Sequence, residues 1–210
     1  MIRVALVDDH EMVREALGQI LEDSAEVQVV GRAATCAGAR ALVVETTPDV
    51  LVLDYGLPDG SPLALIEQLA ADPAAPRVVV LTVHESPHYA VRVLEAGALG
   101  FVIKAAAFRE LIDGIRAAHR GEIFVSPALA PRVMAQLRRP KRERLGLDSL
   151  SNRELELLRL FGQGLGIQDA ARIQNVSPST ASTYRTRLLE KLGMTSTADL
   201  IRFAIESGLD

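Results

Sequence analysis

Residues 51–60 read LVLDYGLPDG, and Val50 stands before them, so an apolar run gives way to a loop at Asp54. Four consecutive apolar residues, 50–53, are typical of a strand that is buried on both faces of a parallel sheet. Asp54 then lies at the carboxyl edge of that strand, where open α/β folds place their ligands. The stretch therefore predicts a sheet with a carboxylate at its rim.

Three other predicted strands also end in residues that carry chemistry. These are Asp8 and Asp9 after residues 2–7, Thr82 after 78–81, and Lys104 after 100–103. Clustered carboxylates repel one another unless a cation binds them, and oxygen ligands suit Mg²⁺. A carboxylate can act as a nucleophile and form an acyl phosphate, whose oxygens a hydroxyl and an ammonium can hold. The pattern predicts a magnesium site that accepts a phosphoryl group and detects its presence.

Each of these residues also has a structural interpretation. Taken alone, Asp8 and Asp9 would cap the helix that begins near residue 11. Thr82 alone is a common strand residue, and Lys104 alone is a solvated strand end. Their joint placement with Asp54 favours the metal and phosphoryl site.

The histidines give a weaker signal. His84 follows Thr82 by two residues, and it is either an exposed loop residue or one that controls the access of water to an acyl phosphate. His10, His88 and His119 have no metal-ligand spacing, and we expect them on the surface.

Strand-like and helix-like segments alternate through the first 120 residues. The predicted strands are 2–7, 27–32, 50–53, 78–81 and 100–103, and the predicted helices are 12–22, 37–45, 62–71, 87–95 and 108–120. This alternation indicates a parallel sheet with helices on both faces. We predict a doubly wound α/β domain with five strands over residues 1–122.

The second half has a different organisation. Residues 123–146 are predicted to hold a connecting helix, which starts at the Ser126-Pro127 pair, and a basic linker over 138–144. The linker is the preferred interpretation of that charge run, with contact to a DNA backbone as the alternative. Residues 147–210 show no strand pattern and predict an all-α domain of four helices, over 151–163, 167–174, 178–192 and 196–207.

Composition limits the class of protein. The chain has 210 residues, 49% of them hydrophobic, and a single cysteine, Cys36, which excludes an intrachain disulfide and a cysteine-based zinc finger. No apolar stretch approaches the roughly 20 residues that span a bilayer, and the expected localisation is cytoplasmic. The first 126 residues carry 10 Lys/Arg and 18 Asp/Glu, whereas residues 127–210 carry 13 and 9. Only the second half is therefore expected to meet a polyanion.

The helix predicted over 178–192 has two distinct faces on a helical wheel. Ala181, Leu188 and Leu192 fall within one arc and should face the core. The predicted DNA-contacting residues are Ser179, Ser182, Thr183, Tyr184, Arg185, Thr186, Arg187 and Lys191. Short polar side chains can approach base edges, and Arg, Lys and Tyr can hold phosphates. The preceding helix and the short turn at 175–177 have the spacing of a helix-turn-helix.

Two resemblances follow from these motifs. Residues 1–120, with VDDH at 7–10, LDYGLPDG at 53–60, LT at 81–82 and AGALGFVIK at 96–104, resemble the receiver domain of two-component response regulators, a flavodoxin-like fold. Residues 147–210, with LSNRELELL at 150–158 and SPSTASTYRTRLLEKLG at 177–193, look like the LuxR-type DNA-binding domain. This order of domains is that of NarL/FixJ-type response regulators.

The resemblance implies a mechanism and its partners. A sensor histidine kinase donates a phosphoryl group to Asp54, while Mg²⁺ is held by Asp8, Asp9, Asp54 and the backbone carbonyl of Gly56. Thr82 and Lys104 bind the phosphoryl oxygens, and Thr82 and Phe101 form the switch, with Phe101 turning inward. The resemblance further implies that phosphorylation releases the second domain to bind double-stranded DNA as a homodimer. The final helix is predicted to pair two chains through Leu200, Ile201, Ala204 and Ile205.

Two competing functions remain open at this point. One is a signalling adaptor, in which the second domain binds a protein and has lost DNA contact, since Ser182 and Thr186 leave its outward face poor in cations. The other is a Mg²⁺-dependent phosphohydrolase that uses Asp54. The resemblance favours a regulator that is not an enzyme.

Overall fold

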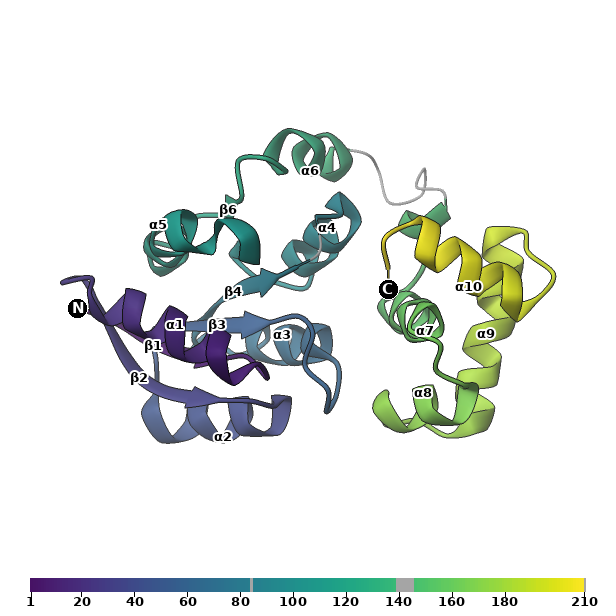
Figure 1. The fold of residues 1–210 in the computed structure, drawn as a ribbon, viewed down its shortest axis with the longest axis horizontal. Helices are drawn as coiled ribbons and strands as arrows, with labels where there is room; N and C mark the ends of the chain where they lie inside the picture. Colours follow the sequence, from purple (N-terminus) through teal and green to yellow (C-terminus); the bar gives the residue numbers. More distant parts are fainter. Residues whose placement is uncertain (84, 139–145, 210) are drawn as a thin grey trace. The chain divides into compact units, whose positions relative to one another are not determined.

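In the part of the chain that the structure describes, residues 1–83, 85–138 and 146–209, six parallel strands form one sheet (Figure 1). The structure is a computed structural model. The strands are β1 (Ile2–Val7), β2 (Val27–Ala33), β3 (Val50–Asp54), β4 (Arg77–Thr82), β5 (Gly100–Ile103) and β6 (Phe124–Val125), in the order β2-β1-β3-β4-β5-β6. The strand order reverses between β1 and β3, and open α/β sheets bind ligands at such a point.

Helices cover both faces of this sheet, as the alternation predicted. They are α1 (Glu11–Glu22), α2 (Cys36–Thr46), α3 (Pro62–Ala70), α4 (Pro87–Glu95) and α5 (Ala107–His119), which follows a 3₁₀ turn, η1 (Lys104–Ala106). One buried cluster joins α1 and α5 to the even-numbered residues of β1 and β3, among them Leu6 and Val52. Strand β3 is buried along its whole length, which explains its unbroken apolar run over residues 50–53.

The sixth strand corrects the prediction of five. Phe124 and Val125 pair in parallel with Gly100 and Phe101 of β5, at residues that were expected to begin the linker. A two-residue strand carries no alternating pattern long enough to be recognised from sequence. The predicted boundaries 1–122, 123–146 and 147–210 stay predictions, and the chain divides into two units, Met1–Val133 and Met134–Asp210.

The connecting helix begins later than predicted, because α6 spans Ala130–Leu137. Ser126 does not cap it with its side chain. The Ser126 side chain is buried, accepts a hydrogen bond from the Ile103 amide at 3.1 Å and donates one to Glu110 at 2.5 Å. The Ser126 hydroxyl therefore binds Ile103 and Glu110 and, contrary to what the Ser-Pro pair had predicted, does not cap a helix. The predicted linker from residue 139 onward, and His84, lie outside the described residues.

The second unit is all-helical, as predicted. Within residues 146–209 a 3₁₀ turn, η3 (Gly146–Ser149), precedes four helices: α7 (Asn152–Gly162), α8 (Ile167–Ile173), α9 (Pro178–Leu192) and α10 (Thr197–Glu206). Helix α7 packs against α9 and α10, and α8 packs against α9. Ser151 and Ser196 each form a capping box, which fixes the starts of α7 and α10.

Candidate functional site

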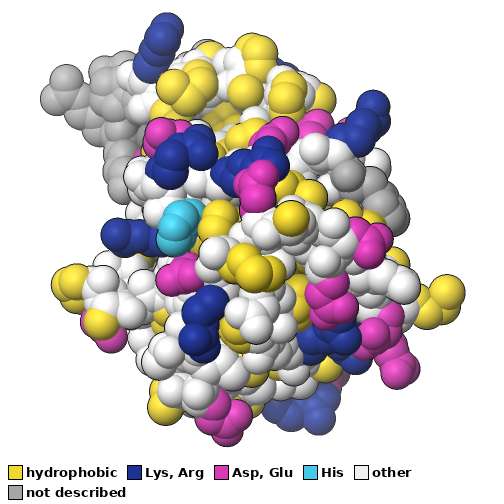
Figure 2. Space-filling model, turned by 90° about the vertical axis from the view of Figure 1, so that its left-hand side faces the viewer, with side chains coloured by type: hydrophobic (Ala, Val, Ile, Leu, Met, Phe, Trp, Pro, Cys, Tyr) yellow, Lys and Arg dark blue, Asp and Glu magenta, His cyan; other side chains and the backbone are white. Residues whose placement is uncertain are grey.

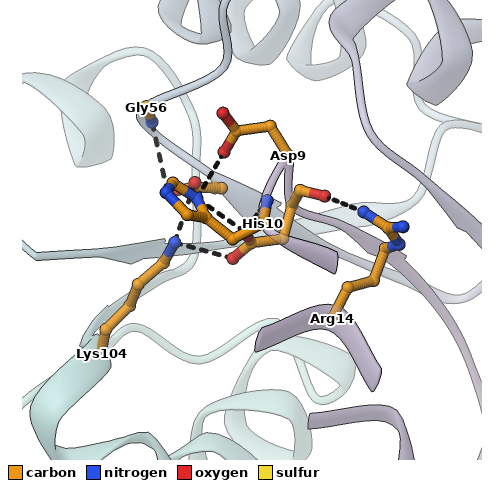
Figure 3. A network of polar contacts seen from close by, with 7 residues as sticks. Asp9, His10, Arg14, Gly56 and Lys104 are labelled. Atoms are coloured by element: carbon orange, nitrogen blue, oxygen red, sulfur yellow. Dashed lines mark hydrogen bonds and ion pairs between the residues drawn. The ribbon is translucent and has the colours of Figure 1, made fainter. Parts of the chain in front are cut away.

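The alternation of side chains along the strands gathers three charged residues on one side of the sheet. Residues of even number in β1, β3 and β5, such as Leu6, Val52 and Val102, pack under α1 and α5. Asp8, Asp54 and Lys104 continue these rows by one further step of two residues, so they emerge at the carboxyl edge on the same side. The Lys104 Nζ lies 2.7 Å from Asp8 Oδ2 and 2.9 Å from Asp54 Oδ2 (Figure 3).

Asp54 is a buried carboxylate with both oxygens engaged. Its Oδ2 accepts from Lys104, and its Oδ1 accepts from the Gly56 amide at 3.2 Å. Burial raises the pKa of Asp54 above its usual value, although the hydrogen bond and charge of Lys104 oppose that rise. Burial would lower the pKa of Lys104, but its bonds to Asp8 and Asp54 outweigh burial and raise it. The amine therefore stays charged, and the pair holds a preset geometry.

His10 and Arg14 also bind the acidic residues of this site, although the sequence analysis did not assign them to it. The His10 Nδ1 lies 2.8 Å from Asp9 Oδ1, and the His10 amide donates to Asp8 Oδ1 at 2.9 Å (Figure 3). Arg14 of α1 donates to the Asp8 carbonyl at 2.6 Å. His10 is exposed, as expected, yet it joins the acidic cluster. Its place directly after the acidic pair was the only signal in the sequence, and Arg14 gave none.

The acidic cluster fits a hard cation. Ligand atoms of Asp8, Asp9, His10 and Asp54 all lie within 4.8 Å of one another. Three carboxylates at this separation are the type of donor set that Mg²⁺ takes, together with waters. The Gly56 amide faces Asp54, and the predicted role of the Gly56 carbonyl as a ligand stays a prediction.

Thr82 and Phe101 belong to the opposite side of the sheet. Leu81 packs under α1 and α5, so its neighbour Thr82 points the other way and is buried. Thr82 pairs with Ile103, which directly precedes Lys104. The Phe101 ring is fully buried in this structure. The predicted inward turn of Phe101 on phosphorylation stays a prediction.

Among the described residues, the amino ends of the strands carry no comparable cluster of His, Cys, Asp and Glu. Figure 2 shows basic and acidic side chains interspersed on that face of the first unit. Exposed pairs join Arg116 to Glu26 at 2.7 Å and Arg120 to Glu122 at 2.6 Å. Exposed pairs of this kind contribute little to stability or recognition. The concentrated charge of this unit is at the carboxyl edge.

In the second unit, α9 begins and ends as its sequence predicted. The Ser177 hydroxyl accepts from the Thr180 amide at 3.1 Å, Pro178 opens the helix, and Gly193 closes it with φ of 65°. Ala181 and Leu188 are buried, as the helical wheel required, whereas Leu192 is half-buried. The opposite arc is open to solvent, with Ser179, Thr183, Thr186 and Arg187 exposed and Ser182, Tyr184 and Arg185 half-buried.

Known families match both units. Residues 4–116 match the family described as "Response regulator receiver domain", and residues 148–204 match "Bacterial regulatory proteins, luxR family". The chain is a response regulator of the NarL/FixJ type. The resemblance noted from the sequence motifs is thereby confirmed.

Relatives of this response regulator match over nine tenths or more of its length. The response regulator GacA of Pseudomonas aeruginosa is 32% identical over 209 residues, which cover 100% of this chain and 98% of GacA. The transcriptional regulatory protein LiaR of Bacillus subtilis is 34% identical over 192 residues, 91% of each chain. RcsB of Salmonella enterica serovar Typhimurium, solved on a promoter with the phosphomimetic BeF3⁻, has a TM-score of 0.75 at 26% identity and covers 96% of this chain and 97% of RcsB.

The cations of α9 in this response regulator are not equivalent. Lys191 donates to Glu154 at 2.7 Å and to the Ser149 carbonyl at 3.2 Å, so its ammonium already binds the start of α7. Burial would raise the pKa of Glu154, but the hydrogen bonds from Lys191 and Ser151 hold it below its usual value. Among the residues of α9, all of which are described, Arg187 and Lys191 are the exposed cations, and Arg185 is half-buried.

The predicted pairing surface on α10 needs correction. Leu200 and Ala204 are fully buried within the response regulator's second unit, whereas Ile205 is 52% exposed and Ile201 is half-buried. The four residues were assigned together because they share helical spacing, but part of that apolar stripe packs against α7 and α9 within the same chain.

Among the described residues, no helix is both long and apolar enough to cross a bilayer.

Proposed function

We propose that Asp54 accepts a phosphoryl group from a sensor histidine kinase and that this modification controls binding of α9 to double-stranded DNA. The observation that carries the proposal is the convergence of Asp8, Asp54 and Lys104 at the carboxyl edge of the sheet, within 2.9 Å of a shared ammonium. The luxR-family match of the second unit and the promoter-bound RcsB support the DNA-binding half.

The receiver residues have distinct roles in this reaction. The ionised carboxylate of Asp54 attacks phosphorus, a phosphorus–oxygen bond forms, and the phosphorus–nitrogen bond to the kinase histidine breaks. Lys104 favours the ionised form of Asp54, because its hydrogen bond and charge oppose the rise in the pKa that burial causes. After transfer, Lys104 and the Thr82 hydroxyl hold the phosphoryl oxygens by charge-assisted and neutral hydrogen bonds. The chain is assigned no turnover of an external substrate.

The acidic cluster is the proposed magnesium site. Asp8, Asp9 and Asp54 would hold the ion through carboxylate oxygens, and Gly56 would add its carbonyl. A bound Mg²⁺ neutralises the negative charge that the phosphoryl group and the three carboxylates would otherwise concentrate at the site. His10 is the nearest further donor, and its bond to Asp9 orients that carboxylate.

The proposed readout lies in the second unit. Helix α9 enters a major groove with Ser179, Ser182, Thr183 and Thr186 toward the bases. Tyr184, Arg185, Arg187 and Lys191 serve as phosphate partners, Lys191 after exchanging its bond to Glu154. Two chains pair through the open residues of α10, Ile201 and Ile205, so that two copies of α9 meet successive turns of the groove. The proposed location of this soluble regulator is the cytoplasm.

A protein-binding adaptor is less well supported. Such a surface would carry large exposed apolar side chains, which bury well against a partner. Among the described residues, the large exposed hydrophobics are Met1, Met12, Val44, Val83, Ile123, Met134 and Ile205, and none of them is on α9.

The test combines a covalent and a binding measurement on the full chain. With acetyl phosphate and Mg²⁺, the wild type should gain a hydroxylamine-labile phosphoryl group by intact mass spectrometry, and Asp54→Asn should not. Treatment with BeF3⁻ should then strengthen dimeric DNA binding of the wild type in a gel shift and leave Asp54→Asn unchanged. Equal labelling of both proteins, or equal DNA affinity with and without activation, would contradict the proposal.

A further inference from the structure

Two threonines on the exposed face of α9 have their hydroxyl groups turned back onto the helix. The Thr183 Oγ1 donates to the Ser179 carbonyl at 3.1 Å, and the Thr186 Oγ1 donates to the Ser182 carbonyl at 3.1 Å. Both residues are exposed. Threonine in a helix adopts this rotamer because its hydroxyl can bond the carbonyl four residues earlier.

This arrangement changes what the two side chains offer to a partner. A hydroxyl has one proton to donate, and here that proton is committed to a backbone carbonyl. The outward groups are then the methyl group and the remaining lone pairs of the oxygen. Thr183 and Thr186 therefore present apolar contacts and acceptors, not donors.

The positions of the outward arc that point toward the bases carry no long side chain with two donors. Guanine is read chiefly by a bidentate Arg or Lys, and adenine by Asn or Gln. At positions 179, 182, 183 and 186 the chain has Ser, Ser, Thr and Thr. The Ser179 hydroxyl is shared with the cap, since it lies 2.9 Å from Ser177 Oγ. The exposed Arg187 lies at the edge of this arc, where a phosphate contact fits its long side chain.

We propose that Thr183 and Thr186 determine DNA specificity by contacting the C5-methyl groups of thymines in the major groove. Thymine is the base that carries a methyl group there, and threonine methyls suit it. This inference rests on the proposed function, because it assumes that α9 enters the groove. The inference also predicts which DNA sequences are bound, namely half-sites with thymines at the positions that the two threonines contact.

The spacing of the two threonines further defines the operator. Residues three apart on a helix are separated by about 4.5 Å along its axis, and base pairs are stacked about 3.4 Å apart. Thr183 and Thr186 therefore address adjacent base pairs. The expected half-site contains two neighbouring A·T pairs, with a thymine methyl available to each threonine.

The first experiment identifies the operator. The full chain, activated with BeF3⁻, is used to select duplexes from a randomised library at a stated salt concentration. We expect adjacent thymines in each half-site. Guanine at these positions would overturn the inference. Retention of no DNA in any state would instead count against the proposed function, so the two failures are distinguishable.

The second experiment removes single methyl groups. Uracil replaces thymine in the selected half-site, which deletes the C5-methyl and keeps base pairing. Loss of one buried methyl should weaken binding about four-fold. The same replacement outside the half-sites is the control and should have no effect. Equal affinity for the thymine and uracil half-sites would overturn the inference.

Matched variants assign the methyl to its partner. Thr183→Ser keeps the hydroxyl and loses the methyl, so its thymine-to-uracil ratio at that pair should fall from about four to about one. Thr183→Val keeps a methyl and loses the hydroxyl, so its ratio should remain near four. The same pair of variants at Thr186 should affect the neighbouring base pair. A ratio that falls with Val and survives with Ser would mean that the hydroxyl reads the base, which would overturn the inference.

Discussion

The receiver site and the outward face of α9 use polar side chains in opposite ways. At the sheet edge, Asp8 and Asp54 are buried and share one ammonium, so their partners are already supplied by the protein. On α9, Thr183, Thr186 and Arg187 are exposed to solvent. A phosphoryl group is small, and buried side chains that are already in place can bind it in a medium of low dielectric. DNA is a large partner, and the side chains proposed to contact it are solvated before it binds.

The largest effect should come from removing the shared cation. Lys104→Met keeps an apolar stem but leaves two buried carboxylates unpaired, so the free energy of unfolding of the receiver should fall by about 3 kcal/mol in magnesium-free buffer. Hydrogen exchange of the β3 and β5 peptides during a urea titration would measure this loss. Arg109→Met, which removes an exposed cation of α5, is the matched control.

The same variant has a predicted pH dependence. Since the pKa of Asp54 is raised in the folded state, its protonation stabilises the fold. That contribution is fully present below the ordinary Asp pKa of about 3.9, and it is lost as the pH rises through the folded-state pKa. Without Lys104 the pKa of Asp54 rises further, so the deficit of Lys104→Met should shrink on acidification. A deficit that is independent of pH would contradict the buried pair as its cause.

The next effect separates the core of α10 from its surface. Leu200→Ala removes a fully buried side chain and should destabilise the second unit by about 3 kcal/mol. Ile205→Ala, at a 52% exposed position, should change stability by less than about 0.5 kcal/mol and weaken pairing on DNA. Exchange of α7 and α10 peptides would report stability, and gel shift would report pairing. Similar destabilisation by both variants would refute the division of α10 into these two faces.

The smallest effect concerns the link between α9 and α7. Lys191→Met should lower the stability of the second unit by about 1 kcal/mol at neutral pH, because the lysine is partly exposed and its charge is screened. The pKa of Glu154 is lowered in the folded state, so the contribution is present above the ordinary Glu pKa of about 4.3 and is lost as the pH falls through the folded-state pKa. Exchange of the α7 peptide at several pH values would follow it. Arg172→Met, which breaks an exposed pair with Asp169, should show no such dependence.

Much of the fold could be predicted, because its signals are local. The strands β1 and β5 and the helices α4 and α9 have the predicted bounds, since apolar runs, a Ser-Pro start and a closing glycine each act within a few residues. The receiver site was also accessible. The carboxyl ends of parallel strands lie at one edge of the sheet, so the proximity of Asp8, Asp54 and Lys104 could be predicted from the sequence.

The errors in the prediction arise where a residue has two possible partners. Ser126 could cap a helix or bond to a distant strand, and the structure gives its hydroxyl to Ile103 and Glu110. Leu200 could face a second chain or its own core, and it lies in the core. The predicted contact of Lys191 with phosphate stays a prediction, and in this structure without DNA the Lys191 ammonium binds Glu154.

The sequence by itself determined the two-domain organisation, the parallel sheet, the acidic pair with Asp54 and Lys104, and the helix-turn-helix, because periodicity and strand-end placement are properties of neighbouring residues. The tertiary structure decided the sixth strand, the entry of His10 and Arg14 into the site, and which threonine and lysine groups already have partners. Those choices depend on which atoms come within hydrogen-bonding distance once distant segments pack, and a linear pattern does not contain that information.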